Sequence, residues 1–268
     1  MIYISTDFDR ERSAAYTLLV RGGATQTTIA IIGDDQRLKV IAAGRPGAAG
    51  KEMTDLLALN FSAVKLAFHG GRYAFVPDEV FEAASVPQYL GHLPNDGLAE
   101  TFVSAIAPLG IRMLHQCDRL AIGPFVERFP NLHIGSTMQA LLHGVSGYAQ
   151  RERTPVLAID RHDASLLVCG FEGDRFVYGN DFEVVSDDDI RYYLYAVVDH
   201  LRWNEQRPRI CLSGDVGLQD DIHQWAQEHG IAVDFAESGR LSGISIPEEI
   251  KPKEHQYLTL LGLHLCGS

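Results

Sequence analysis

The residues of this chain that could bind a ligand or do chemistry gather in three short segments, each placed at the end of an expected strand. They are Arg21, Gly22, Gly23, Asp160, Arg161, His162, Ser213, Gly214 and Asp215. Paired glycines let backbone N–H groups approach an anion and an arginine can attract one, whereas Asp163 and Asp215 would repel it. Turns also collect glycine and polar residues for backbone reasons. We therefore expect residues 21–25 to be a permissive hairpin connection and residues 160–163 to be a solvated hairpin turn.

No pattern in the sequence is typical of a metal site or of a hydrolase. The histidines are scattered, without an HxH or HExxH spacing, and Ser213 does not lie in a GxSxG motif. The cysteines lie far apart and form no CxxC pair: Cys117, Cys169, Cys211 and Cys266. The second and third of them fall in apolar strand patterns, where a small buried hydrophobe is expected. We expect no metal, and reduced thiols in a cytoplasmic protein.

The composition is that of a globular protein and excludes several classes of partner. The chain has 268 residues, of which 46% are hydrophobic and 22% charged, so it can form two medium-sized domains. Its formal net charge of −12 would repel a nucleic acid backbone. No apolar run is long enough to span a bilayer, and residues 1–10 lack the pattern of a secretion signal. Nucleic acid and a transmembrane segment are not expected.

The first half of the chain begins with strands and becomes helical later. In order, we expect strands at 15–20, 27–32 and 38–43, a helix at 50–60, a hairpin of strands 64–68 and 73–76 with its turn at 69–72, a short helix from 77, an irregular segment at 87–110, a strand pair at 111–122 and a helix at 136–148. These assignments rest on hydrophobic periodicity and on glycine and proline turn signals.

The second half repeats this layout after a polar joint at residues 150–153. We expect strands at 156–159, 166–169 and 175–178, a turn at 180–182, a helix at 186–201, a strand at 209–212, a helix at 218–229, a strand at 231–235 and a final helix at 254–266. Ser186 and Asp189 have the spacing of a capping box. The two halves predict two related α/β domains, residues 1–150 and 151–268.

Short motifs, in their order along the chain, resemble an uncharacterised bacterial family, a domain of unknown function with an actin-like ATPase fold. The motifs are residues 75–81, 89–90, 180–182, 189–193 and 212–214. The closing part of the chain more distantly resembles actin-like proteins of pilus assembly and type II secretion, through residues 210–215, 224–225 and 260–267. The resemblance implies two ribonuclease H-like domains, each with a mixed five-stranded sheet flanked by helices.

The resemblance also implies where a nucleotide would lie. Actin-like ATPases hold phosphates with one glycine-bearing hairpin per domain, and an acid in each hairpin positions metal or water. Asp160 stands at that acid's place in the second half, but no small residue follows it, and no acid ends the strand at 15–20. Asp215 replaces the last glycine of a Ser-Gly-Gly pattern at the adenosine site. We expect Asp215 to cap the helix that begins near Leu218.

A carboxylate at position 215 would also weaken nucleotide binding. One like-charge contact at roughly 4 Å costs on the order of 4 kcal/mol at an effective dielectric near 20. A micromolar complex is worth about 8 kcal/mol, so such a contact reduces its affinity to millimolar. The three segments thus predict a degenerate nucleotide site.

Three hypotheses follow for the function. The preferred one is a non-catalytic interaction or scaffold protein, with a protein partner or a homo-oligomer and no cofactor. The alternative is a divergent ATP-binding protein, an ATPase or phosphotransferase that uses ATP and Mg²⁺ with Asp160 and the Ser213-Gly214 turn. In the third, the cleft between the domains binds another small anion through Arg21 and Arg161.

Overall fold

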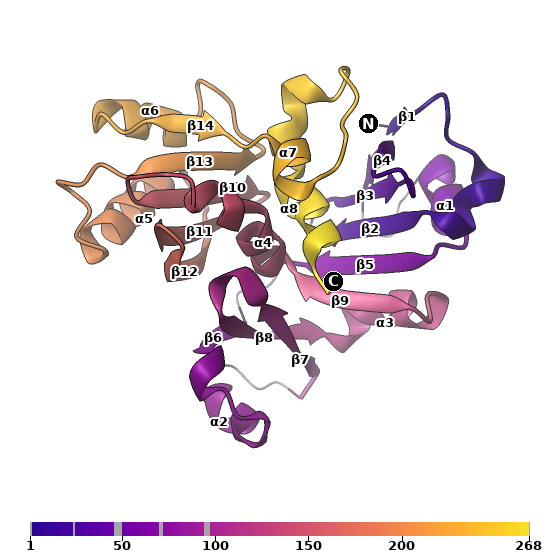
Figure 1. Ribbon diagram of the computed structural model, residues 1–268, viewed down its shortest axis with the longest axis horizontal. Coiled ribbons are helices and arrows are strands. Elements are labelled where there is room, and N and C mark those ends of the chain that lie inside the picture. The colour runs from indigo at the N-terminus through magenta and orange to yellow at the C-terminus, as the bar shows by residue number, and fades with distance from the viewer. Residues whose placement is uncertain (1, 24, 46–49, 70–71, 94–96, 268) are drawn as a thin grey trace.

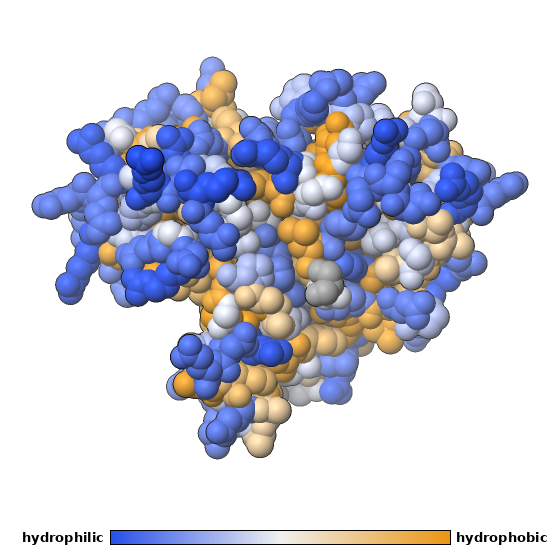
Figure 2. Space-filling view, viewed as in Figure 1, coloured by the Kyte–Doolittle hydropathy of each residue, from blue (hydrophilic) through white to orange (hydrophobic). Residues whose placement is uncertain are grey.

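The computed structural model describes residues 2–23, 25–45, 50–69, 72–93 and 97–267. Two large sheets lie at opposite ends of the molecule, with helices between them and a small three-stranded sheet below (Figure 1). In the view of Figure 2, hydrophilic residues cover most of the outer surface around both large sheets, and hydrophobic residues gather in the middle, along the C-terminal segment. None of the helices in the described ranges is long and apolar enough to cross a membrane.

The first sheet has six strands, one more than the five expected. Its order is β1 (Ile2–Ile4), β4 (Leu38–Gly44), β3 (Thr27–Ile32), β2 (Thr17–Gly22), β5 (Ala63–Phe68) and β9 (Leu132–Ser136). Strands β2, β3 and β4 form an antiparallel meander, β1 is a short antiparallel addition at its edge, and β5 and β9 continue the sheet in parallel with β2.

The second sheet repeats the order and directions of the first without the added edge strand. Its strands are β12 (Arg175–Glu183), β11 (Ser165–Glu172), β10 (Val156–His162), β13 (Arg209–Gly214) and β14 (Val233–Phe235). Strands β10, β11 and β12 form the antiparallel meander, and β13 and β14 follow in parallel with β10. Both sheets therefore have one topology, as the repeated sequence layout predicts.

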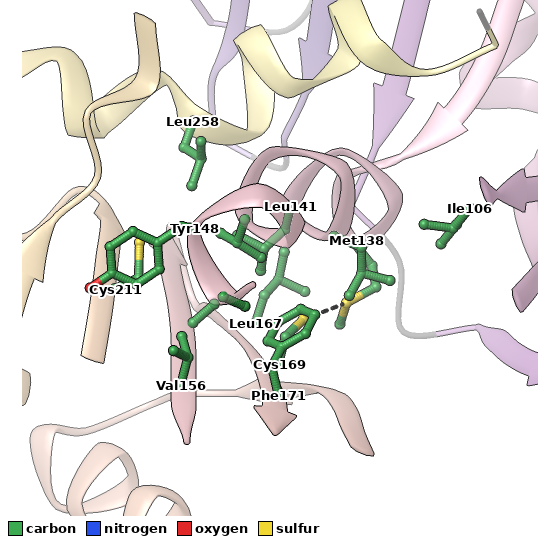
Figure 3. Packing of buried hydrophobic residues seen from close by; sticks show 14 of the residues in the cluster. Ile106, Met138, Leu141, Tyr148, Val156, Leu167, Cys169, Phe171, Cys211 and Leu258 are labelled. Carbon is green, nitrogen blue, oxygen red and sulfur yellow. Dashed lines mark hydrogen bonds between the residues drawn. The ribbon is translucent and has the colours of Figure 1, made fainter. Parts of the chain in front are cut away.

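The helices between the two sheets are interleaved. Helix α4 (Thr137–Ala149) packs on the second sheet, and Figure 3 shows its side chains above those of β10 and β11, with Met138 beside Cys169. The C-terminal segment consists of the 3₁₀ helix η5 (Lys251–Tyr257), α8 (Leu258–Leu261) and η6 (Gly262–Leu265), and it packs on the first sheet. A boundary at residue 150 stays a prediction, because packed elements cross it in both directions.

The small sheet corrects the predictions for residues 64–76, 87–110 and 111–122. It consists of β6 (Tyr73–Pro77), β8 (Ile111–Asp118) and β7 (Ala99–Ile106), all antiparallel, with β8 in the middle. The hairpin predicted from strands 64–68 and 73–76 is wrong, because β5 belongs to the first sheet and β6 to the small one. Gly70 and Gly71 of its predicted turn lie outside the described residues. Residues 87–110, expected to be irregular, contain β7.

The predicted strand pair at residues 111–122 is also wrong. It is a single strand, β8, followed by helix α3 (Arg119–Arg128). Asp118 begins the helix, since its side chain accepts a hydrogen bond from the Leu120 backbone N–H at 2.8 Å. The Gly-Pro pair inside α3 hides it from a reading of the sequence.

Helix starts in the second half are well defined. Helix α5 (Asp187–His200) begins with the predicted capping box: Ser186 accepts from the Asp189 backbone and the Asp189 carboxylate accepts from the Ser186 backbone at 2.8 Å. Helix α6 (Asp221–Glu228) is capped by Asp220, which accepts from the Ile222 N–H at 3.1 Å. The prediction that Asp215 caps this helix is therefore wrong.

The remaining elements are short or confirm single predictions. They are η1 (Arg10–Ala15), α1 (Lys51–Leu57), η2 (Asp78–Val80), η3 (Ala83–Ser85), α2 (Val86–Tyr89), η4 (Ala107–Leu109) and α7 (Ser238–Ser242). The predicted turn at 180–182 is wrong, because β12 continues to Glu183. Cys169 and Cys211 are buried hydrophobes, as predicted, and all four cysteines are free.

Candidate functional site

The two hairpin segments singled out in the sequence meet at one cavity of about 380 Å³ between the large sheets. From the first sheet, the end of β2 contributes Arg21, Gly22 and Gly23, and from the second, β10 and the end of β13 contribute further residues. The sequence-derived residues that line the cavity are Arg21, Gly22, Gly23, Asp160, His162 and Asp215. The other three, Arg161, Ser213 and Gly214, do not line it.

Asp160 is a buried and fully partnered carboxylate rather than part of a solvated turn, so that expectation is wrong for this residue. Only 1% of it is exposed. The Ser213 hydroxyl donates a hydrogen bond to Asp160 Oδ2 at 2.6 Å, and Thr259 Oγ1 lies 3.5 Å from Asp160 Oδ1. The reason is that β10 continues through His162, which carries Asp160 into the sheet, and the turn begins at Asp163.

A chain of polar contacts leads from Asp160 across both sheets. The buried Arg21 guanidinium donates to Nε2 of His162, and it also lies 3.3 Å from Thr259 Oγ1. Because a guanidinium can only donate, His162 Nε2 accepts, and its Nδ1 donates to Asp215 Oδ2 at 3.1 Å. This hydrogen bond from His162 lowers the pKa of Asp215. Burial lowers the pKa of Arg21, and the charges of Asp160 and Asp215 oppose that effect.

A second contact joins the hairpin turns directly. Thr25 Oγ1 donates to Asp163, and the Thr25 backbone N–H lies 3.4 Å from Asp163 Oδ2. A Cβ on Gly23 would lie 2.9 Å from the same carboxylate oxygen and 2.8 Å from the Gln26 carbonyl. The absence of a side chain at Gly23 therefore allows the two turns to approach each other this closely.

The backbone amides at these turns already have protein acceptors. The Gly23 N–H donates to the Gln26 carbonyl at 3.0 Å, and the Asp215 N–H donates to the Arg161 carbonyl at 2.7 Å. A phosphate-binding hairpin needs such amides free to face the anion. These two amides do not meet that requirement.

Gly214 is required by the packing of β10 against β13. Its φ is +95°, and a Cβ at this position would lie 2.0 Å from the Arg161 carbonyl oxygen. The Arg161 side chain pairs with Asp220 at 2.8 Å and lies 3.7 Å from Asp187. Arg161 thus contacts the starts of α5 and α6 and leaves Arg21 as the arginine of the cavity lining.

Three residues that the sequence did not single out form a second cluster in the cavity. Asp181 Oδ2 lies 3.1 Å from His69 Nε2, and the Ser165 hydroxyl donates to Asp181 Oδ1 at 2.9 Å. Ser165 Oγ is also 3.3 Å from His69 Nδ1. The single hydroxyl hydrogen goes to Asp181, so Ser165 and His69 are not arranged as a nucleophile and its base. Burial raises the pKa of Asp181, and His69 opposes that effect.

No local pattern could have revealed this cluster. Its members come from the residue after β5 in the first sheet and from β11 and β12 in the second. Strands β11 and β12 pair with each other, and the approach of the two sheets brings His69 to them. Asp181 was part of the predicted turn at 180–182, where an aspartate needs no functional explanation.

The lining of the cavity is strongly acidic. Its carboxylates are Asp160, Asp163, Asp181, Glu183 and Asp215. Against them stand Arg21 and the rings of His69 and His162. Within the part of the chain that the structure describes, no group of three or more His, Cys, Asp or Glu side chains could hold a metal ion. The geometry suits neutral or cationic groups better than a polyphosphate.

Comparisons with known proteins agree with the fold. The model of a family described as "Protein of unknown function (DUF3822)" matches residues 51–230. No curated protein matches the sequence.

Two solved structures cover nearly the whole chain. A protein of Bacteroides thetaiotaomicron VPI-5482 with an actin-like ATPase fold and unknown function has a TM-score of 0.78 at 15% identity, over 97% of this chain and 99% of that one. A PilM–PilN type IV pilus biogenesis complex contains a chain with a TM-score of 0.70 at 12% identity, over 93% of this chain and 97% of that one. The expected actin-like ATPase fold is confirmed.

Proposed function

We propose that this chain, which belongs to the family of proteins of unknown function DUF3822, is a non-catalytic interaction or scaffold protein built on the actin-like ATPase fold. One observation carries the proposal: the cavity at the two hairpin turns is lined by five carboxylates and one arginine, Arg21. The proposal places the protein in the cytoplasm.

Electrostatics and sterics both support a degenerate nucleotide site. Each carboxylate about 4 Å from a phosphate oxygen costs on the order of 4 kcal/mol at a dielectric near 20, and a micromolar complex is worth only about 8 kcal/mol. The contacts of His162 with Arg21 and of Asp163 with Thr25 also occupy the space between the two turns. A cavity of 380 Å³ could admit a small ligand, but its lining disfavours a triphosphate.

The comparison with a PilM–PilN complex supports a protein partner, since a chain of this fold forms a complex there. Exposed hydrophobic side chains offer contact area on this chain. Tyr192 and Tyr195 of α5 are 67% and 57% exposed, and Val185 just before this helix is 86% exposed. Tyrosine is among the residues enriched at protein interfaces. The proposed partner is another protein or a second copy of this chain.

The alternative, a divergent ATP-binding protein, draws on the fact that Arg21 and Asp160 face one cavity. In that case Asp160 would orient the metal or water and the Ser213-Gly214 turn would lie at the adenosine. The buried hydrogen bond from Ser213 to Asp160 argues instead that this acid holds β10 and β13 together.

Calorimetric titration with ATP and Mg²⁺ separates the two proposals. The wild-type protein should show no binding tighter than millimolar and release no phosphate. The variant Asp160→Asn keeps the size of the side chain and should behave in the same way. A micromolar dissociation constant, or hydrolysis that Asp160→Asn abolishes in a protein that still folds, would establish the alternative.

The proposed binding of another protein, or of a second copy of this chain, is tested by a separate experiment. Protein captured from source cells on the immobilised chain should bind again when both proteins are purified, with an affinity that ATP does not change. The combined variant Tyr192→Ala and Tyr195→Ala should weaken this binding if α5 is the contact surface. A purified chain that stays monomeric and binds none of the captured proteins contradicts the scaffold role.

A further inference from the structure

The accessible carboxylates that line the cavity between the large sheets form two pairs along the second sheet. The β12 pair is Asp181 and Glu183, which are two positions apart on their strand and so project from the same face. The turn pair is Asp163, in the turn after β10, and Asp215, which follows β13. Strands β11 and β10 separate β12 from β13, and neighbouring strands lie roughly 4.8 Å apart. The two pairs are therefore up to about 14 Å from each other.

Strand β11 places an uncharged strip beside the β12 pair, on the way to the turn pair. Leu167 of β11 lies opposite Asp181, and Ser165 lies opposite Glu183. Directly paired residues point to the same face of a sheet, so both side chains belong to the floor of the cavity. Leu167 is apolar, and Ser165 already donates its hydroxyl hydrogen to Asp181. The strip can therefore contact a hydrocarbon chain that carries its charged groups at either end.

The protein does not balance the negative charge of this lining. Five carboxylates against one guanidinium leave a formal charge of −4 when both imidazoles are neutral. The guanidinium, that of Arg21, is already held by His162 and Thr259, and the start of α4 adds only about half a positive charge. The Glu183 side chain is exposed, and its carboxylate has no hydrogen bond or ion pair with another described residue. A cationic ligand would supply the charge that the lining lacks.

A polar group without a partner lies in the wall formed by α4. Thr137, the first residue of α4, lines the cavity and is only 5% exposed. Its hydroxyl forms no hydrogen bond with another described residue, and it is not one of the polar atoms that the fold shuts away from solvent. Folded proteins satisfy nearly all of their buried polar groups, so this hydroxyl requires an explanation. A molecule in the cavity can reach it and provide the missing partner.

We propose that this cavity binds a linear aliphatic polyamine, with one ammonium group at the β12 pair, another at the turn pair, and its methylene chain over the strip of β11. The Thr137 hydroxyl accepts a further N–H of the ligand. The carboxylates retain acceptor positions for these contacts, because each has about four and the protein uses at most two of them. Hydrogen bonds between an ammonium and a carboxylate are among the strong ones. A single metal ion could not span the two pairs.

The polyamine site rests on the proposed function, because both require that no nucleotide occupies this cavity. The two can nevertheless fail separately. Micromolar binding of ATP would remove both, since a nucleotide would then lie between the carboxylate pairs. Absence of polyamine binding, in a protein that does not bind ATP either, would remove the polyamine site and leave the interaction or scaffold role as proposed.

Calorimetric titration at constant ionic strength tests the site with putrescine and spermidine. Butylamine, which has one ammonium group, and 1,4-butanediol, which has none, are the matched controls for putrescine. Both polyamines should bind, whereas butylamine should bind about tenfold more weakly than putrescine and the diol should not bind. Mg²⁺ should also bind about tenfold more weakly than putrescine, because it contacts only one pair at a time. In NMR spectra, the ring resonances of His69 and His162, which line the cavity, should shift as putrescine is added.

Single variants locate the ligand. Glu183→Gln and Thr137→Val should each weaken putrescine binding about fivefold, since each removes one contact with an ammonium group. Glu127→Gln makes the same change of charge at an exposed position of α3 outside the lining, and it should leave the affinity unchanged. Thermal melting shows which variants fold, and the exposed Glu183 decides if Thr137→Val does not. Absence of polyamine binding, butylamine or Mg²⁺ binding as tightly as putrescine, or an equal effect of Glu183→Gln and Glu127→Gln overturns the proposal.

Discussion

At the scale of single residues, the polar groups that suggested a ligand site hold the protein together. Asp160 receives its hydrogen bonds from Ser213 and Thr259, which lie 53 and 99 positions further along the chain. A sequence of polar residues after a strand is typical of an exposed turn, and the sequence alone gives no sign of these distant partners. The residue types were therefore identified correctly, but their environment was not.

Gly214 shows the same structural role and can be tested directly. Gly214→Ala should destabilise the protein by roughly 3 kcal/mol, because alanine is strained at positive φ and its Cβ would meet the Arg161 carbonyl. Gly217→Ala is the matched control, since a Cβ there meets no atom within 4 Å. Urea unfolding measures both. Equal stability of the two variants would show that β10 and β13 can separate at this point.

At the scale of elements, helix caps and turn residues predicted the structure around them well, whereas the pairing of strands in the small sheet was not predicted. The start of α5 is visible in the sequence because the two residues of its capping box, Ser186 and Asp189, lie only three positions apart. The three meander strands of each half were also located, because turn signals separate them, although β1 was not predicted and β10 and β12 extend beyond their predicted ends. Strand β6 was located but given the wrong partner, because it pairs with β8, much further along the chain. Strands β7 and β8 form a local hairpin across residues 107–110, and the proline, glycine and asparagine residues of 87–110 hid its first strand.

The capping box yields a prediction at this scale. Ser186→Ala should cost about 1 kcal/mol of stability, and Ser186→Asp, which keeps an acceptor, should recover most of it. Hydrogen bonds from the Ser186 and Val185 backbone lower the pKa of Asp189. The stabilisation by Asp189 is therefore present above the carboxyl's ordinary pKa and is lost as the pH falls below it. Chemical unfolding at pH 7 and pH 3 should show a smaller effect of Ser186→Ala at the lower pH, and an effect as large at pH 3 would contradict the reciprocal cap.

At the scale of the whole molecule, the repeated strand order makes the fold recognisable, and the contacts between the halves decide what it can do. The candidate cavity could be anticipated from the sequence because both hairpins end central strands of matching sheets. Two of its five carboxylates could not, because Asp181 and Glu183 reach the cavity from β12, an edge strand expected to end earlier.

The contact between Thr25 and Asp163 joins the turns of the two sheets and gives a prediction at this scale. Asp163→Ala should raise amide hydrogen exchange severalfold in residues 22–27 and 160–165, because the turns lose their link. Asp174→Ala, at an exposed turn of β11 and β12, should leave those segments unchanged. Unaltered exchange in Asp163→Ala would mean that other contacts suffice to hold the turns.

The position of the C-terminal segment on the first sheet bears on how the protein is made. Leu260, Leu261 and Leu263 complete a core whose other half, including Leu19 and Ile41, is translated more than two hundred residues earlier. The leading strands thus emerge from the ribosome with one hydrophobic face uncovered, and they stay so until nearly all of this sequence has been synthesised. The nascent chain has a long interval in which a chaperone could shield that face.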